Sequence, residues 1–343
     1  MSGDSTRAAH AGAPEAEQFA PFLPGPVLAA PYHLAGPGDP RGYGRYANPT
    51  WEAYERALGD LEGGEAVVFS SGMAAAAAVL LPQRGRVVMP RDSYYNVRQL
   101  AADHATAEVV DVPSTTEAFV TAAEGAALVW VETPTNPGLD VVDVAAVAEA
   151  TRAAGALLVV DTTVATPLRL RPLELGADLV CSSATKALTG HSDLVLGYVA
   201  ARDADRAAAI RKLRGVVGSV PGPLEVWLAH RSLATLALRL ERQEATARTL
   251  ADALRGRRDV EDVRWPGLGG VVVFDLGTEE RATAFLAACR IVTEATSFGG
   301  VHSTAERRAR WGGDEVSPGL VRFSCGIEDT DDVVADVLRA VPA

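Results

Sequence analysis

Short apolar runs alternate with alanine-rich stretches through much of the chain. Strands buried on both faces of a parallel sheet have this continuous apolar character, and helices make the crossovers between them. The pattern predicts an α/β region built on a mostly parallel sheet. The runs lie at residues 67–69, 86–89, 108–110, 128–131, 157–160 and 179–181.

The remainder of the chain has a different pattern. Leucines recur at helical spacing over 224–254, with Arg and Glu on the other side, which predicts one long helix linking two domains. Apolar runs at 270–276, 291–295 and 320–324 predict strands of a smaller α+β domain. Thr330, followed by two aspartates, is a candidate N-cap for a closing helix.

Prolines interrupt any periodic pattern before residue 43, so residues 1–42 are expected to form an extended arm. The predicted organisation is this arm, a large domain over 43–223 and a C-terminal domain over 224–343. A chain of 343 residues with 48% hydrophobic content can bury a core of this size.

Charge and composition narrow the classes of partner. A net charge of −12 repels phosphate backbones and anionic lipids, so neither nucleic acid nor a membrane surface is expected as a partner. No apolar stretch approaches the roughly 20 residues that span a bilayer, and no secretory signal is recognisable. Three cysteines without metal-ligand spacing predict reduced thiols and no metal site. We therefore expect a cytoplasmic protein that acts on a small molecule.

Two residues that follow predicted strands suggest chemistry. Asp161 ends the run 157–160, and Lys186 comes shortly after the run 179–181. Ligands bind at the carboxyl ends of strands in open parallel sheets, so both side chains should reach one crevice. A lysine there can form a Schiff base with a carbonyl cofactor, and an aspartate can keep a pyridine nitrogen protonated. Taken singly, Lys186 is more often a solvated lysine and Asp161 could equally be a helix cap.

A candidate phosphate cradle follows the first apolar run. Ser71, Gly72 and Met73 precede an alanine-rich helix, and backbone N–H groups at a helix start bind phosphate oxygens. The same residues taken alone also fit an ordinary turn between a strand and a helix. Ser183 and Thr185 could add hydroxyl donors to the same phosphate.

Several short segments occur in a particular order along the chain. Each segment alone is a weak signal of a protein family, whereas the ordered set is a specific one. Together they resemble the Cys/Met-metabolism family of pyridoxal-phosphate enzymes, the group of cystathionine γ-lyase, cystathionine γ-synthase and methionine γ-lyase. The resemblance covers almost the whole chain and implies a fold-type I transferase fold. It also implies pyridoxal phosphate as cofactor, an amino-acid substrate and a homo-oligomer, a dimer with shared sites that pairs into a tetramer. The matching segments are 43–50, 71–74, 132–137, 160–163, 183–186, 190–193, 297–300 and 321–329.

The resemblance also implies roles for single residues. Lys186 would hold the cofactor covalently and act as the base, and Asp161 would face its ring nitrogen. Tyr94 would stack on the ring and assist proton movements as a third catalytic residue. Tyr43 and Arg45 would reach the cofactor phosphate of a neighbouring subunit.

A second set of residues would bind the substrate. The resemblance implies that Arg322 holds the α-carboxylate, with help from Asn136 and Ser297. An arginine on a strand could also be a structural ion pair. Thr296 stands where members that handle cystathionine often have a glutamate, which favours a shorter or uncharged substrate side chain.

Three other departures concern the substrate. Asn96 stands where methionine γ-lyases have a reactive cysteine, which weakens a methionine-cleaving assignment. Tyr95 replaces a common glycine and adds bulk near the cofactor, and the segment after Leu268 is shorter than is usual in the family.

The sequence therefore predicts a lyase that catalyses β/γ-elimination from an amino acid with a γ-leaving group, similar to cystathionine γ-lyase. Elimination or replacement on a non-sulfur substrate, such as a γ-halo or O-acyl amino acid, is the alternative. A cofactor-binding or assembly subunit without turnover is the alternative from another class.

Overall fold

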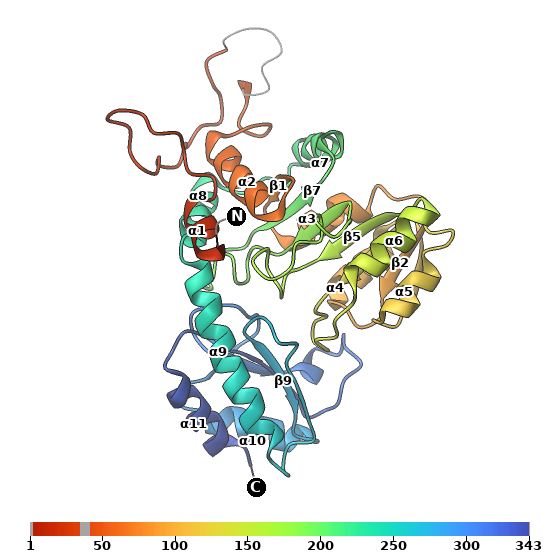
Figure 1. The fold of residues 1–343 in the computed structure, drawn as a ribbon, viewed down its shortest axis with the longest axis vertical. Coiled ribbons are helices and arrows are strands. Elements are labelled where there is room, and N and C mark those ends of the chain that lie inside the picture. Colours follow the sequence, from red (N-terminus) through yellow and green to blue (C-terminus); the bar gives the residue numbers. More distant parts are fainter. Residues whose placement is uncertain (1–2, 35–41, 343) are drawn as a thin grey trace.

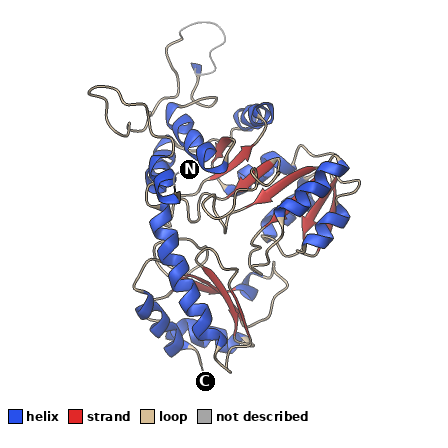
Figure 2. Ribbon diagram, in the orientation of Figure 1, coloured by secondary structure: helices blue, strands red, loops and turns tan. Residues whose placement is uncertain are grey.

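The structure is a computed structural model that describes residues 3–34 and 42–342. Two β-sheets, each flanked by helices, make up most of it (Figures 1 and 2). The predicted residues 35–41 of the arm lie outside the described residues. None of the helices in the described ranges is long and apolar enough to cross a membrane.

The larger sheet has seven strands in the order β1-β7-β6-β5-β4-β2-β3. Every neighbouring pair is parallel except the two made by β7, which runs antiparallel to β1 and β6. The predicted mostly parallel α/β sheet is confirmed, whereas β7 was not predicted. The strands are β1 (Glu65–Phe69), β2 (Arg86–Pro90), β3 (Glu108–Val112), β4 (Leu128–Glu132), β5 (Leu157–Asp161), β6 (Leu179–Ser182) and β7 (Gly197–Ala201).

Helices connect these strands and pack against the sheet. Their starts follow local capping chemistry: the Asn48 side chain caps α2 and Ser71 caps α3, each accepting a backbone N–H. The apolar strand residues lie in the core beneath these helices. The helices are α2 (Pro49–Glu62), α3 (Gly72–Leu80), α4 (Tyr95–His104), α5 (Thr116–Ala122), α6 (Val144–Ala154) and α7 (Ala204–Val217).

The single long helix predicted over 224–254 is wrong. The chain forms α8 (Pro223–Leu233) and then α9 (Leu236–Arg255), with a break between them. The guanidinium of Arg239 donates to the carbonyl of Ser232 at 2.9 Å, so a group freed by the break is paired. The same guanidinium donates to the carbonyl of Leu188 at 3.2 Å, so the break is also in contact with a distant part of the chain.

The smaller sheet has the order β10-β11-β12-β9-β8. The predicted strand 320–324 is confirmed, the strand at 270–276 is shorter than predicted, and only two residues of 291–295 form a strand. Strands β8 and β11 were not predicted. The strands are β8 (Asp262–Arg264), β9 (Val271–Asp275), β10 (Thr293–Glu294), β11 (Thr304–Arg307) and β12 (Leu320–Ser324).

Three helical segments accompany the smaller sheet: α10 (Glu279–Ala288), η2 (Arg308–Trp311) and the closing helix α11 (Thr330–Ala340). The predicted N-cap is wrong by one residue, because Asp329 has the cap position and Thr330 is the first helical residue. The hydroxyl of Thr330 bonds instead to Thr246 on α9 at 2.8 Å. Figure 1 shows α9 running alongside this sheet together with α10 and α11.

The beginning of the predicted arm is not entirely extended. Residues Asp4–His10 form α1, which packs against α9 and α2. Asp4 pairs with Arg169 and Arg171, each at 3.3 Å. The described residues between 13 and 30 have no helix or strand, and the role of the arm stays a prediction.

Candidate active site

A cavity of about 430 Å³ lies where the carboxyl ends of β4, β5 and β6 face the smaller sheet. Glu132, Asp161 and Ser182 are the last residues of these three strands, and all three line the cavity. Every residue predicted for the site lines it except Tyr43 and Arg45. The predicted residues in its wall are Ser71, Gly72, Met73, Tyr94, Asn136, Asp161, Ser183, Thr185, Lys186, Thr296, Ser297 and Arg322.

Lys186 lies in the turn after β6 and extends into the cavity. Its Nζ donates a hydrogen bond to Ser297 Oγ at 2.8 Å and lies 5.3 Å from the centre of the Phe298 ring. Burial, followed by the positive charge of Arg322, lowers the pKa of Lys186 to about 8. A substantial fraction of this amine is therefore neutral near pH 8, and a neutral amine is a nucleophile and a base.

Asp161 is buried at the end of β5. Its Oδ1 accepts hydrogen bonds from the hydroxyl of Thr163 at 2.6 Å and from the Thr163 backbone N–H at 2.9 Å. Burial raises the pKa of Asp161 to about 6. A cationic partner in the cavity would lower this pKa and keep the carboxylate ionised.

Glu132 is a site residue that the sequence reasoning missed. It is buried at the end of β4, where Oε1 accepts the Asn136 N–H at 2.6 Å and Oε2 accepts the Tyr94 N–H at 2.9 Å. Burial, and then the charge of Asp161, raises the pKa of Glu132 well above its ordinary value. Glu132 thereby positions two of the predicted residues. Its position at the end of a predicted strand could have identified it as a site residue.

The start of α3 forms a tight cradle in the cavity wall. Ser71 Oγ caps the helix by accepting the Ala74 N–H at 3.0 Å. A Cβ added at Gly72 would lie 2.8 Å from Ser183 Cβ, so only glycine allows this approach. Backbone N–H groups at such a helix start bind anions such as phosphate. Thr185, a predicted hydroxyl donor, instead donates to the Leu196 carbonyl at 2.9 Å in this structure.

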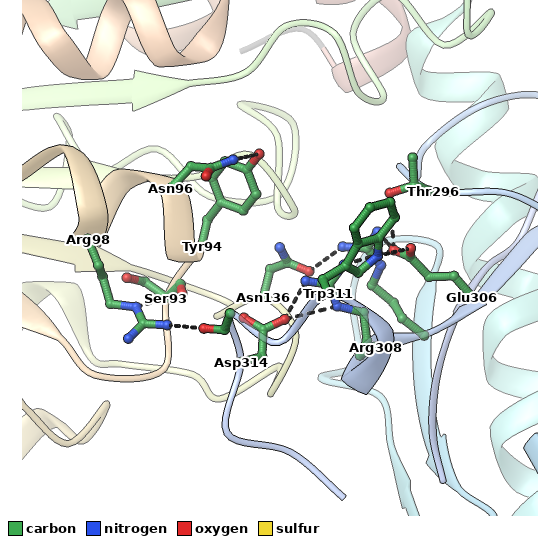
Figure 3. Close-up of polar contacts among 12 residues, drawn as sticks. Ser93, Tyr94, Asn96, Arg98, Asn136, Thr296, Glu306, Arg308, Trp311 and Asp314 are labelled. Carbon is green, nitrogen blue, oxygen red and sulfur yellow. Dashed lines mark hydrogen bonds and ion pairs between the residues drawn. The ribbon is translucent and has the colours of Figure 1, made fainter. Parts of the chain in front are cut away.

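Tyr94 precedes α4, and its ring lies in the cavity wall. Its hydroxyl accepts a hydrogen bond from Asn96 Nδ2 at 2.8 Å (Figure 3). The ring also contacts Tyr95 edge-on, with 5.3 Å between the ring centres. Asn96 is therefore a partner of Tyr94.

Arg322 projects from β12 and is buried in the opposite wall. Its Nη1 donates to Asn136 Oδ1 at 2.6 Å, and its Nη2 bonds Glu306 and, at 3.3 Å, the Ser297 carbonyl. Its Nε is buried and has no hydrogen-bond partner among the described residues. Burial, and then the charge of Arg308, lowers its pKa to about 10, so it remains a cation at neutral pH.

Tyr43 and Arg45 lie away from this cavity. The guanidinium of Arg45 bonds the Gly215 carbonyl and stacks over Tyr46, with 4.4 Å from its central carbon to the ring centre. Tyr43 is about half exposed. Neither residue contributes to the cavity of its own chain, and their action on a neighbouring subunit stays a prediction.

Comparison with known proteins identifies the family. Residues 33–342 match the family described as Cys/Met metabolism PLP-dependent enzyme. The chain belongs to this family. A putative cystathionine gamma-lyase of Streptomyces coelicolor is 51% identical, with 99% of this chain and 93% of the relative covered. The cystathionine gamma-lyase of Bacillus subtilis is 36% identical, with 87% and 88% covered.

A solved structure of this PLP-dependent family agrees in fold. A methionine gamma lyase from Micromonospora echinospora has a TM-score of 0.93 and 39% sequence identity, with 100% of this chain and 99% of the other covered. This agreement over the whole length supports the same two-sheet architecture.

The donor set of the cavity fits pyridoxal phosphate, the cofactor of the family. An aldehyde requires an amine with a depressed pKa, which Lys186 has. A pyridine nitrogen requires a buried carboxylate, which Asp161 offers. A phosphate requires a close backbone approach at a helix start, which Gly72 and Ser71 allow.

Proposed function

We propose that this protein is a pyridoxal-phosphate-dependent lyase that eliminates the γ-substituent of an amino acid, in the manner of a cystathionine γ-lyase. The observation that carries the proposal is the single cavity in which Lys186, Asp161 and Arg322 meet. The names of the relatives support the same reaction class.

Four groups would hold the cofactor. Lys186 would bind its aldehyde carbon, Asp161 would pair with its ring nitrogen, and the start of α3 at Gly72 would hold its phosphate. Tyr94 would contact the ring. When bound, pyridoxal phosphate supplies an electron sink that makes a proton on the substrate Cα removable.

Arg322 would orient the substrate through its α-carboxylate. Its guanidinium is held in place by Glu306, Asn136 and the Ser297 carbonyl, and its buried Nε is a free donor within the described part of the chain. An arginine fork binds a carboxylate in one orientation, which places the Cα proton in a defined position.

Lys186 would move the protons. Its pKa of about 8 lies close to neutral pH, where general acid and base catalysis is most effective. The amine would take the proton from Cα, and it would protonate the product at a later step. The balanced reaction consumes one water and converts the γ-substituted amino acid to a 2-oxo acid, ammonia and the protonated leaving group.

Thr296 favours a second candidate. It lines the cavity as a neutral side chain, whereas a glutamate would suit a distal ammonium group. γ-Elimination or γ-replacement on an O-acyl or γ-halo amino acid therefore stays open. A cofactor-binding subunit without turnover is the remaining alternative, and the presence of Lys186, Asp161 and Arg322 together argues against it.

The proposal extends to assembly and location. We infer a homo-oligomer, because Tyr43 and Arg45 do not line the cavity of their own chain and Phe19 and Phe22 of the arm are exposed. The buried thiols of Cys181 and Cys325 are free, which suits a reducing compartment such as the cytoplasm.

Absorption and product assays test the proposal. We expect purified protein with pyridoxal phosphate to have a visible band and to release a 2-oxo acid and ammonia from γ-substituted amino acids. Lys186→Ala should lower the turnover number by at least about 10²-fold, the scale of lost general-base catalysis, while retaining some cofactor. Unchanged turnover would remove Lys186 from its role, and a band without turnover would support the binding subunit.

A further inference from the structure

A wall of the cavity is built by residues that no motif indicated. The chain leaves β11, forms η2 and continues to Asp314. Within this stretch Trp311 and Arg308 line the cavity. Trp311 is 48% exposed as a residue, so it borders the mouth of the cavity. We call residues 308–314 the wall segment.

Ion pairs hold the base of the wall segment. Arg308 Nη1 donates to Glu306 at 2.9 Å, and Arg308 Nε donates to Asp314 at 3.1 Å. Glu306 also pairs with Arg322. Burial opposes ionisation of Glu306, but Arg322, Trp311 and Arg308 together lower its pKa. The guanidinium groups of Arg308 and Arg322 therefore balance the carboxylates of Glu306 and Asp314, so these four buried groups carry no net charge together.

Hydrogen bonds fix Trp311 beside the reaction centre. Its Nε1 donates to Glu306 Oε2 at 2.8 Å, and the other oxygen of Glu306 accepts a bond from Thr296 at 3.3 Å (Figure 3). Thr296 directly precedes Ser297, whose hydroxyl bonds Lys186 Nζ. A short series of contacts thus connects the indole ring with the amine.

The other end of the wall segment is braced against α4. Arg98 Nη2 donates to the Gly313 carbonyl at 3.0 Å. Arg98 Nε donates to the carbonyl of Ser93 at 3.2 Å, and Figure 3 shows these two residues side by side. A Cβ added at Gly313 would lie 2.7 Å from the Tyr95 ring. The brace therefore sets Tyr95 and Trp311 as two aromatic surfaces of one cavity.

We propose that Trp311, held by the wall segment, determines specificity by selecting substrates whose leaving group is uncharged. This role of Trp311 rests on the proposed γ-elimination and narrows the class of its substrate. Glu306, Arg308 and Asp314 are each almost fully buried and already paired with one another. Arg310, whose guanidinium lies 5.6 Å from the centre of the Trp311 ring, is paired with Glu294. A charged distal group would therefore lose water at this wall without gaining an unpaired ion partner, whereas an apolar group gains contact with the indole.

A matched pair of thioethers tests the proposal. S-Ethylhomocysteine and cystathionine carry the same C–S bond and a chain of similar length, but only cystathionine ends in a charged amino-acid group. We expect wild-type kcat/KM for the ethyl compound to exceed that for cystathionine by about tenfold or more, the range of one apolar contact. Trp311→Ala should lower this ratio by a similar factor, mainly by raising KM for the ethyl compound.

Two further variants test whether Trp311 causes the difference in kcat/KM between the two thioethers. Arg98→Ala removes the brace to Gly313 without changing a residue of the cavity wall, so it should shift the ratio in the same direction as Trp311→Ala and by less. Trp227→Ala is the matched control, since Trp227 bonds the Pro24 carbonyl and does not line the cavity. It should leave the ratio unchanged.

The outcomes separate the two proposals. Turnover of both thioethers with a ratio that neither Trp311→Ala nor Arg98→Ala changes would overturn the role of Trp311 and leave the lyase intact. A wild-type preference for cystathionine would do the same. Absence of 2-oxo acid from either compound and from O-acyl or γ-halo amino acids would overturn both proposals. If Trp311→Ala does not fold, Trp311→Phe and Trp311→Gln replace it: the ratio should survive only with the aromatic side chain.

Discussion

The carboxyl group of Glu62, which has no ion partner among the described residues, is buried at the end of α2. The hydroxyl of Tyr198 donates to Glu62 Oε1 at 2.5 Å, while Oε2 is buried without a partner among the described residues. Burial raises the pKa of Glu62 to about 8. The folded protein therefore holds a proton on this carboxyl that the unfolded chain releases near pH 4.5.

This difference makes stability depend on pH. The contribution of the protonated carboxyl is fully present below about pH 4.5 and is lost as the pH rises through about 8. We expect Glu62→Gln, which stays neutral, to lose less unfolding free energy between pH 5 and 8 than the wild type, by on the order of a few kcal/mol. Urea unfolding at several pH values measures this difference. Glu149→Gln, at an exposed site on α6, is the control and should follow the wild type.

At the residue scale, the sequence could place reactive side chains in the site where they lie next to the end of a strand. Lys186 and Asp161 could be placed in one crevice because the carboxyl ends of neighbouring parallel strands meet at one edge. Glu306 and Arg308 could not be predicted, because each looks like an ordinary charged residue until its partner from another element is known.

At the scale of one element, the start of α3 both stabilises the helix and borders the cavity. Ser71 Oγ caps the helix, and the same turn borders the cavity. We expect Ser71→Ala to cost about 1 kcal/mol of unfolding free energy through the lost cap and also to raise the dissociation constant of pyridoxal phosphate. Urea unfolding and cofactor titration measure these two effects.

A second capped helix provides the matched control. Thr115 caps α5 by accepting the Ala118 N–H at 3.3 Å, and it does not line the cavity. Thr115→Ala should cost a similar stability without changing cofactor affinity. Equal cofactor affinity in the two variants would count against a phosphate site at the start of α3.

The helices and strands that were missed show where the local sequence pattern is not sufficient to predict secondary structure. The apolar runs predicted six strands of the larger sheet, because strands buried on both faces have an unbroken apolar character. Strand β7 was missed although it is buried along its whole length, since two of its five residues are alanine and one is glycine. The break between α8 and α9 was missed because Ala234 and Thr235, which lie at the break, include no glycine or proline.

At the scale of the whole molecule, the separation of Tyr43 and Arg45 from the cavity predicts a shared site. We expect Arg45→Ala and Lys186→Ala chains each to be inactive alone. A mixed dimer of the two has one site with both wild-type residues, so it should recover up to about half of the wild-type activity. Activity after mixing and reassembly measures this recovery.

The control for this experiment places both changes in one chain. Mixing the double variant with Lys186→Ala chains gives no intact site and should give no recovery. Absence of activity in confirmed mixed dimers of the single variants would contradict a role for Arg45 at a neighbouring site.

The sequence by itself determined the fold class, because this follows from apolar periodicity. The resemblance of short segments next to strand ends indicated the cofactor family and half of the residues that line the cavity. Only the tertiary structure decided how the smaller sheet completes the site. Trp311, Glu306 and Arg308 acquire their roles from Arg322, Asn136 and Thr296, which come from other parts of the chain. The physical reason is that a buried charge is stable only where partner groups replace the water that it loses. Those partners come together only when the two sheets face each other.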